Sequence, residues 1–420
     1  MGFKKNIIMK HIYIVNESSI ASSYGIGTYI NHVVASLRDT DFQITVIDLY
    51  GSQKEFTVVW KDGVKHLQIP SVHILSHSLS SSAYQERVAE NIALILYPHV
   101  SQSEQNIFHL NFTKDYYIAK ALKKYYKCKI VLTVHCSEWS FQLLGNKQKL
   151  LKRLSAKNKR ASKIIQTMEL ERKLMLDVVD NIIAIASHSY NDLLDIYQIP
   201  ANKITIIRNA VGDKFRLMSE SRVKQTRKRF FFTEKNLIVF AGRLNYVKGI
   251  DYLIKAFKIV LTYLPDSRLV IAGDGPIEKD LYKLAAPYWS RITFTGFINQ
   301  NQLYRLFSIA DIGVLPSLHE EFGLVAIEMM MCKLPIIVND STGLSELVEN
   351  GIDGLKFTIK RETAYKRDSI HRIADQIVNL LNNKPLRDSV AVNAREKFVK
   401  KYSLPRFRKQ LIAFYNQLYR

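Results

Sequence analysis

The chain has 420 residues, of which 47% are hydrophobic, 60 are Lys or Arg and 38 are Asp or Glu, giving a formal net charge of +22. This length favours two or three domains, and the hydrophobic content excludes a disordered or fibrous chain. No apolar run approaches the roughly 18 residues of a transmembrane helix.

Two features bear on the compartment of the protein. The apolar segment from Phe3 to Val15 is interrupted by lysines and a histidine, which is wrong for a secretory signal peptide. The cysteines Cys128, Cys136 and Cys332 are widely spaced and form no CxxC pair. We therefore expect a cytoplasmic protein in a reducing environment.

Short apolar runs typical of buried strands alternate with helical patterns along the chain. In the first half, strands are predicted at 12–15, 44–49, 107–110, 130–134, 182–186 and 204–207. Between the second and third, Asp62-Gly63 separates two β-rich runs and predicts a hairpin over 56–69. In the second half, strands at 237–242, 268–272, 292–295, 312–315 and 334–338 alternate with helices at 250–264, 277–284, 303–309, 324–331 and 344–348. This alternation predicts an α/β protein with two Rossmann-like, doubly wound parallel sheets.

Two basic segments stand out, and the net charge calls for an anionic partner. The first carries Lys147, Lys149, Lys152, Arg153, Lys157, Lys159, Arg160 and Lys163 with leucines between them. It suits either a basic amphipathic helix on an anionic membrane surface or an ordinary solvated helix. The second, over 222–229, lacks the aromatic residues and fold signature of a nucleic-acid-binding domain, so a solvated helix is expected there and a nucleic-acid partner is not.

The segment Leu-Pro-Ser-Leu-His-Glu-Glu-Phe-Gly-Leu, from 315 to 324, lies at a predicted strand-to-helix junction. Glu320 precedes the Phe-Gly-Leu turn and Glu328 falls in the second turn of the following helix. Ligands of open α/β sheets bind at the carboxyl ends of strands, where helix N-termini present free N–H groups to phosphates. A helix glutamate there can accept from paired ribose hydroxyls, and a loop glutamate can bind a sugar. The alternative is a helix-capping acid in a surface loop.

Two further strand ends carry suitable groups for a phosphate ligand. In Gly-Arg-Leu-Asn-Tyr-Val-Lys-Gly, from 242 to 249, Arg243 offers a planar fork and Lys248 a mobile point charge, which together can neutralise a diphosphate without a metal. At 272–276, Gly273 allows close approach of a ligand to the backbone, although a plain turn explains it equally well.

The two glutamates with seven residues between them, together with Gly-Arg-Leu and Lys-Gly, resemble the signature of the retaining GT-B glycosyltransferases of family 4. The resemblance implies two Rossmann-like domains facing a cleft: an acceptor-side domain over 1–212, a nucleotide-sugar domain over 213–400, and a terminal helix over 401–420 crossing back to the first. It implies transfer of a sugar from a nucleotide-diphosphate donor to an acceptor hydroxyl with retention, in glycan or glycolipid biosynthesis. No metal or other cofactor is implied.

The resemblance also assigns roles to residues. Arg243 and Lys248 would bind the diphosphate, Glu328 the ribose and Glu320 the transferred sugar. Phe322, Gly323 and Leu324 would supply loop shape and backbone donors, and Gly273 would border the nucleotide. In the first domain it implies Gly25, His135 and Asn209 as cleft residues. The chain departs from the family with Tyr24, Ala210 and Glu321 in place of glycine and Cys136 in place of aspartate.

Several alternatives remain open. Asp39-Thr40-Asp41 matches the Asp-x-Asp of metal-dependent transferases, but a turn is the natural interpretation between a helix and the strand 44–49. Other functions are a GT-B relative such as a sugar-phosphate synthase, phosphorylase or epimerase, or a non-catalytic protein that binds nucleotide sugar or acidic polymer. The expected partners are a nucleotide sugar and a glycan or lipid-linked acceptor, with peripheral contact at the inner membrane face through 147–163.

Overall fold

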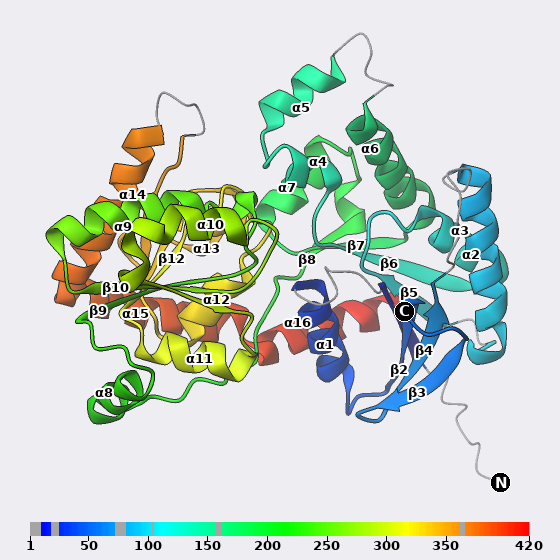
Figure 1. Cartoon of the computed structure of the whole chain (residues 1–420). Helices are drawn as coiled ribbons and strands as arrows, with labels where there is room; N and C mark the ends of the chain where they lie inside the picture. Colours follow the sequence, from blue (N-terminus) through cyan, green and yellow to red (C-terminus); the bar gives the residue numbers. More distant parts are fainter. Residues whose placement is uncertain are drawn as a thin grey trace. The chain divides into compact units, whose positions relative to one another are not determined.

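The computed structural model describes residues 10–17, 25–71, 81–102, 105–155, 162–360 and 366–419, arranged in two compact units (Figure 1). The first unit comprises Met1–Asn209 and Phe407–Arg420, and the second comprises Ala210–Arg406. Each unit is built around one largely parallel sheet.

The first unit has a sheet of order β3-β4-β2-β1-β5-β6-β7-β8. Its strands are β1 (Lys10–Glu17), β2 (Phe42–Gly51), β3 (Thr57–Lys61), β4 (Val64–Pro70), β5 (Asn106–Leu110), β6 (Cys128–Val134), β7 (Asn181–Ala184) and β8 (Ile204–Ile206). Its helices are α1 (Gly25–Leu37), α2 (Ser82–Leu96), α3 (Tyr116–Tyr125), α4 (Glu138–Gln142), α5 (Lys147–Leu154), α6 (Lys163–Lys173) and α7 (Ser187–Asp195). All pairings are parallel except β3 with β4. That pair is the predicted hairpin, with Asp62 and Gly63 both at positive φ as a tight hairpin turn requires.

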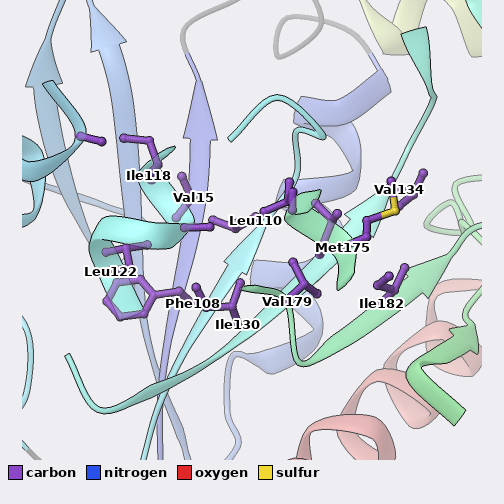
Figure 2. Close-up of a cluster of buried hydrophobic side chains, with 14 of the residues drawn as sticks. Val15, Phe108, Leu110, Ile118, Leu122, Ile130, Val134, Met175, Val179 and Ile182 are labelled. Atoms are coloured by element: carbon purple, nitrogen blue, oxygen red, sulfur yellow. The ribbon is translucent and has the colours of Figure 1, made fainter. Parts of the chain in front are cut away.

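The core of the first unit explains why its strands are apolar runs rather than alternating patterns. All five residues of β5 are buried, because helices cover both faces of the sheet. Figure 2 shows part of the cluster on one face, where Phe108 and Ile130 of the sheet meet Ile118 and Leu122 of α3. Met175, just after α6, extends the same cluster.

The terminal helix α16 (Leu404–Leu418) buries its apolar stripe at positions 407, 411, 414, 415 and 418. Its last turns belong to the first unit, where the Tyr415 hydroxyl lies 2.5 Å from Nδ1 of His109 on β5. Nε2 of His109 lies 2.7 Å from Oγ1 of Thr133, which in turn lies 2.9 Å from the Tyr29 hydroxyl. Burial lowers the pKa of His109 to about 3, so this network holds a neutral imidazole.

The second unit has a sheet of order β11-β10-β9-β12-β13-β14, and every pairing in it is parallel. Its strands are β9 (Asn236–Ala241), β10 (Ser267–Ala272), β11 (Ile292–Gly296), β12 (Ile312–Leu315), β13 (Ile336–Asn339) and β14 (Leu355–Phe357). Its helices are α8 (Glu220–Arg229), α9 (Ile250–Tyr263), α10 (Glu278–Ala285), α11 (Gln300–Ile309), α12 (Leu324–Met331), α13 (Thr342–Leu347), α14 (Lys366–Asn382) and α15 (Lys384–Lys397). In Figure 1, α9 and α10 lie over one face of this sheet, and α11 and α15 over the other.

The predicted strands and helices are confirmed, with ends that differ by one to three residues at most positions. The segment 147–163 is different. Its described part forms only the short helix α5, which ends at Leu154, and a new helix begins at Lys163; Lys157, Lys159 and Arg160 lie outside the described residues. The second basic segment is the expected solvated helix, since α8 has no buried residue.

The Asp-x-Asp segment and the cysteines are as the sequence predicts. Asp39-Thr40-Asp41 forms the turn between α1 and β2, with Asp39 at φ +60° and Asp41 paired with Lys10 at 3.0 Å. All three cysteines are free thiols. In the part of the chain that the structure describes, no helix combines the length and apolar character needed to cross a membrane.

Candidate active site

The order of strands in the second unit defines where a ligand should bind. The chain runs outward from β9 through β10 to β11, and then returns to place β12 on the other side of β9. The carboxyl ends of β9 and β12 therefore flank a topological switch point, the usual ligand-binding position in open α/β sheets. The loops 242–249 and 316–323 follow these two strands. Both loops were singled out from their sequence.

The loops at this edge pack backbone against backbone. The Leu318 amide donates to the Val247 carbonyl at 2.7 Å, which joins the two switch-point loops. Gly249 has φ +63°, and a Cβ there would lie 2.3 Å from the Pro316 carbonyl oxygen. Only glycine fits this position, because a side chain would have to displace main chain rather than a flexible neighbour.

Gly273, after β10, is equally constrained. It has φ +134°, and a Cβ would lie 2.0 Å from the Gly242 carbonyl oxygen. Its amide donates to the Gly296 carbonyl at 3.0 Å. The absence of a side chain therefore lets the turn after β10 pack directly on the turn after β9.

Lys248 and Glu320 meet across the switch point. The Nζ of Lys248 lies 2.5 Å from Oε2 of Glu320, and the two side chains are 23% and 20% exposed. The Asn245 side chain caps the short turn that carries Lys248, accepting from the Lys248 amide at 3.2 Å. Because the cation and the carboxylate both remain partly accessible to water, an incoming anion can share or replace the contact that Lys248 makes with Glu320.

Arg243 lies two residues beyond β9 and is half-buried. Within the described ranges, its guanidinium has no hydrogen bond or ion pair. A half-buried guanidinium without a carboxylate partner at a strand end is suited to bidentate contact with a phosphate.

Glu328 is held differently from Glu320. It lies in the second turn of α12, is 9% exposed, and accepts a hydrogen bond from the Tyr304 hydroxyl at 3.0 Å. Gln300 also donates to the same carboxylate oxygen, at 3.5 Å. Burial raises the pKa of the Glu328 carboxyl, although these two donors and the charge of Lys214 oppose the effect. The structure thus joins Lys248 to Glu320, and Glu328 to α11.

The turn between the two glutamates is set by packing. Phe322 is 4% exposed and makes an edge-to-face contact with Tyr402 at a centroid distance of 5.9 Å. Gly323, at φ +101°, precedes α12, and Leu324 is the first residue of that helix. Phe322 therefore contributes loop shape, while the main chain of 323–324 presents the helix N-terminus.

The other sequence-predicted residues, His135, Gly25 and Asn209, belong to the first unit. His135 follows β6 and is 9% exposed. Its Nε2 lies 3.2 Å from Oδ1 of Asn111, and its ring packs edge-to-face on Tyr29 at 4.6 Å. Burial lowers the pKa of His135 to about 3, so its imidazole is neutral at physiological pH.

The other first-unit residues are at element or unit boundaries. Gly25 is the first residue of α1, and Tyr24 before it lies outside the described residues. Asn209 ends the first of the two chain segments that make up the unit. In the part of the chain that the structure describes, no group of three or more His, Cys, Asp or Glu side chains could hold a metal ion.

Sequence reasoning missed several residues that support the site. Tyr304 and Gln300 of α11 hold Glu328, and Thr342 at the start of α13 contacts the loop that carries Glu320. These partners lie on other helices, α11 and α13, so no local pattern identifies them. Asn245 was recognisable, because an asparagine just before a helical turn is a common N-cap.

Two family models match consecutive parts of the chain. The model described as Glycosyltransferase Family 4 matches residues 24–214, and the model described as Glycosyl transferases group 1 matches residues 221–397. Among sequence relatives, alpha-D-kanosaminyltransferase of Streptomyces kanamyceticus is 31% identical over 224 residues, 53% of this chain and 56% of that protein. The 2-deoxystreptamine N-acetyl-D-glucosaminyltransferase of Niallia circulans is 26% identical over 284 residues, 67% of each chain.

Solved structures share the fold over nearly the whole chain. Sucrose-phosphate synthase of Thermosynechococcus elongatus aligns with a TM-score of 0.76 and 18% identity, covering 98% of this chain and 99% of that one. Anabaena HepE in complex with UDP aligns with a TM-score of 0.71 and 16% identity, covering 97% and 100%. The fold is that of the GT-B glycosyltransferases, and the two family models, which together match most of the chain, identify it as a glycosyltransferase. The chain belongs to family 4 of these enzymes, as the resemblance of its motifs predicted.

Proposed function

We propose that this protein is a retaining glycosyltransferase that moves a sugar from a nucleotide-diphosphate donor to an acceptor hydroxyl in glycan or glycolipid biosynthesis. The observation that carries the proposal is the arrangement at the switch point of the second unit. There Arg243 has no partner within the described ranges, and Lys248 is paired only with the partly exposed Glu320. Two cations at a strand edge next to helix N-termini form a suitable diphosphate site.

In this proposal the donor lies across the loops that follow β9 and β12. Glu328 accepts from the ribose hydroxyls, and Glu320 accepts from hydroxyls of the transferred sugar. The burial of Glu328 favours a hydrogen-bonded ligand over water, because the carboxylate is already largely desolvated. Relatives support a nucleotide-sugar donor: the structure of HepE contains UDP, and another of the same protein contains UDP-glucose.

The proposed chemistry is a front-face displacement. The bond from the anomeric carbon to the β-phosphate oxygen breaks, and its electron pair stays on that oxygen. The acceptor oxygen forms its bond on the same face of the sugar, and its proton passes to the departing phosphate. Arg243 and Lys248 stabilise the charge that develops on the phosphate, which is catalysis by preorganised electrostatics.

We further propose a glycan or lipid-linked acceptor reached at an anionic membrane surface. On α5, Lys149, Lys152 and Arg153 are exposed and Leu151 is 62% exposed, whereas Leu150 is buried and anchors the helix. Exposed cations beside an exposed leucine suit contact with anionic lipid. Charge reversal at Lys149, Lys152 and Arg153 should abolish sedimentation with anionic vesicles. Unchanged sedimentation would contradict the membrane proposal and leave the donor proposal intact.

A donor screen tests the central assignment. UDP-, GDP-, ADP- and dTDP-sugars are compared by thermal shift, because a ligand that binds the folded state raises the melting temperature by an amount that increases with its affinity and concentration. We expect one nucleotide class to stabilise the protein, and expect this stabilisation to be lost in Arg243→Ala but kept in Lys258→Ala, a substitution on the exposed side of α9. Incubation of that donor without acceptor then distinguishes transfer from epimerisation. No shift with any nucleotide sugar would refute the proposal.

A further inference from the structure

His319, next to the proposed sugar-binding glutamate, is a buried histidine with a contact on each ring nitrogen. It is 3% exposed. Its Nδ1 lies 3.2 Å from Oγ1 of Thr342, and its Nε2 lies 3.1 Å from Oε1 of Glu321. Glu321 replaces the glycine that the family usually has, and its side chain is only 16% exposed. The acid therefore points inward and not to solvent.

Thr342 links His319 to the main chain of Glu320. The Thr342 hydroxyl donates to the Glu320 carbonyl at 2.7 Å, while the Glu320 amide donates to the same hydroxyl oxygen at 3.0 Å. Nδ1 of His319 lies against this oxygen. The opposite nitrogen, Nε2, faces a carboxylate oxygen of Glu321, and this contact is favourable only if Nε2 carries a proton and donates it to the carboxylate.

These contacts fix the main chain of Glu320 through both its amide and its carbonyl. Its carbonyl accepts from the Thr342 hydroxyl and from the Gly343 amide at 2.8 Å, and its amide donates to Thr342. Gly343 packs so closely that a Cβ would lie 2.7 Å from the Glu321 carbonyl oxygen. Thr342 itself has φ +29°, an unfavourable conformation for a β-branched residue that is kept only where the surroundings enforce it.

We propose that His319 and Glu321 form a buried hydrogen-bonded pair that acts through Thr342 to fix the main chain of Glu320, and so sets the position of the carboxylate that binds the transferred sugar. The inference rests on the proposed function of the Glu320 loop. His319 and Glu321 are positioning residues: neither needs to touch the donor. In this chain the usual glycine is replaced by Glu321, whose carboxylate holds His319 and so stabilises the loop 316–323.

Steady-state kinetics with the donor test the proposal. Glu321→Gly, which restores the usual family residue, removes the carboxylate that contacts His319. We expect it to raise the donor KM and to lower kcat/KM by about 10- to 100-fold, since a small displacement of the Glu320 carboxylate from the donor weakens transition-state binding. Glu321→Gln keeps an acceptor for Nε2–H and should remain within about fivefold of wild type. Glu396→Gln, an exposed change on α15, is the matched control.

A double-mutant cycle separates positioning from general stability. In a Glu320→Ala background, Glu321→Gly should cause no further loss of kcat/KM, because the group that it positions is already gone. A Glu321→Gly enzyme with a lower melting temperature but wild-type donor KM and kcat/KM would overturn the proposal, since the pair would then be structural only.

A spectroscopic measurement needs neither substrate nor a folded variant of Glu321. The ¹⁵N signals of His319, assigned by comparison with His319→Gln, should show Nε2 protonated and hydrogen-bonded in the wild-type protein. An Nε2 without a proton would overturn the pair. A protonated Nε2 in a protein that turns over no nucleotide sugar would refute the proposed function while leaving the pair in place, so the two failures are distinguishable.

Discussion

Replacement of Lys248 by methionine removes the cation at the switch point while keeping the length and packing of the side chain. In the unliganded protein this cation lies 2.5 Å from Glu320, and in the proposed reaction it stabilises the departing phosphate. Removing one such preorganised donor typically costs about 2.7–4 kcal/mol of transition-state stabilisation. We therefore expect kcat to fall by about 100- to 1,000-fold.

The same substitution has a separate and smaller effect on stability. Glu320 loses its partner, but its side chain is 20% exposed and water can solvate it in part. A loss of about 1 kcal/mol is expected, which lowers the melting temperature of a domain of 150–250 residues by about 2–4 °C. The double variant Lys248→Met/Glu320→Gln removes both charges, so it should recover the stability and not the activity.

Release of nucleoside diphosphate from the donor, followed in the presence of acceptor, measures the catalytic effect, and thermal unfolding measures the structural one. Lys258→Met, an exposed change on α9, controls for the loss of a lysine in the same unit. Turnover of Lys248→Met within threefold of wild type would refute the catalytic role. Recovery of turnover in the double variant would refute the separation of the two effects.

Three further outcomes follow from the structure. Glu328→Gln removes a buried charge but keeps an acceptor, so donor affinity measured by calorimetry should fall about tenfold without unfolding; unchanged affinity would contradict the ribose contact. Gly273→Ala places a Cβ 2.0 Å from the Gly242 carbonyl oxygen, so the free energy of unfolding measured by urea denaturation should fall by about 2–4 kcal/mol. The control is Gly351→Ala, where φ is also positive but the space around the Cβ is open, and there the free energy of unfolding should fall by about 1 kcal/mol. Burial lowers the pKa of His109 to about 3, so the unfolded chain binds the proton first, and this group alone should contribute a decline in stability of about 1.4 kcal/mol per pH unit as the pH falls from 6.5 toward 3. His109→Gln should reduce that slope, and an unchanged slope would show that another group is responsible.

Central strands such as β5 and β9 were predictable because they are short apolar runs buried on both faces, bounded by polar or glycine-containing turns. The hairpin at Asp62-Gly63 was predictable for the same local reason. By contrast, β14 is only three residues long and its sequence Leu-Lys-Phe carries no periodic signal, so it was missed. The described start of the basic segment 147–163 is helical, as expected, but its composition does not reveal that this helix ends at Leu154.

The sequence predicted which loops form the candidate site, but not which side chains contact one another within it. Motif residues at strand ends were expected to gather at one edge, and the strand order places the loops of Arg243, Lys248 and Glu320 at the switch point. The partners of these residues are distant in sequence: Lys248 and Glu320 are 72 positions apart, and Tyr304 and Glu328 are 24 apart. The contacts between these side chains depend on where each helix packs on the sheet, and no local sequence pattern encodes that position.

The central claim is that Arg243 and Lys248 bind the diphosphate of the donor without a metal. Isothermal titration of nucleoside diphosphates into the wild-type protein and into Arg243→Ala, both in EDTA, tests it most directly. We predict that one nucleoside diphosphate binds the wild type in EDTA, and that its affinity falls by at least tenfold in the variant, since a charge-assisted hydrogen bond contributes about 1.5–3 kcal/mol. Equal affinities for the two proteins, or binding that EDTA abolishes, would contradict the account.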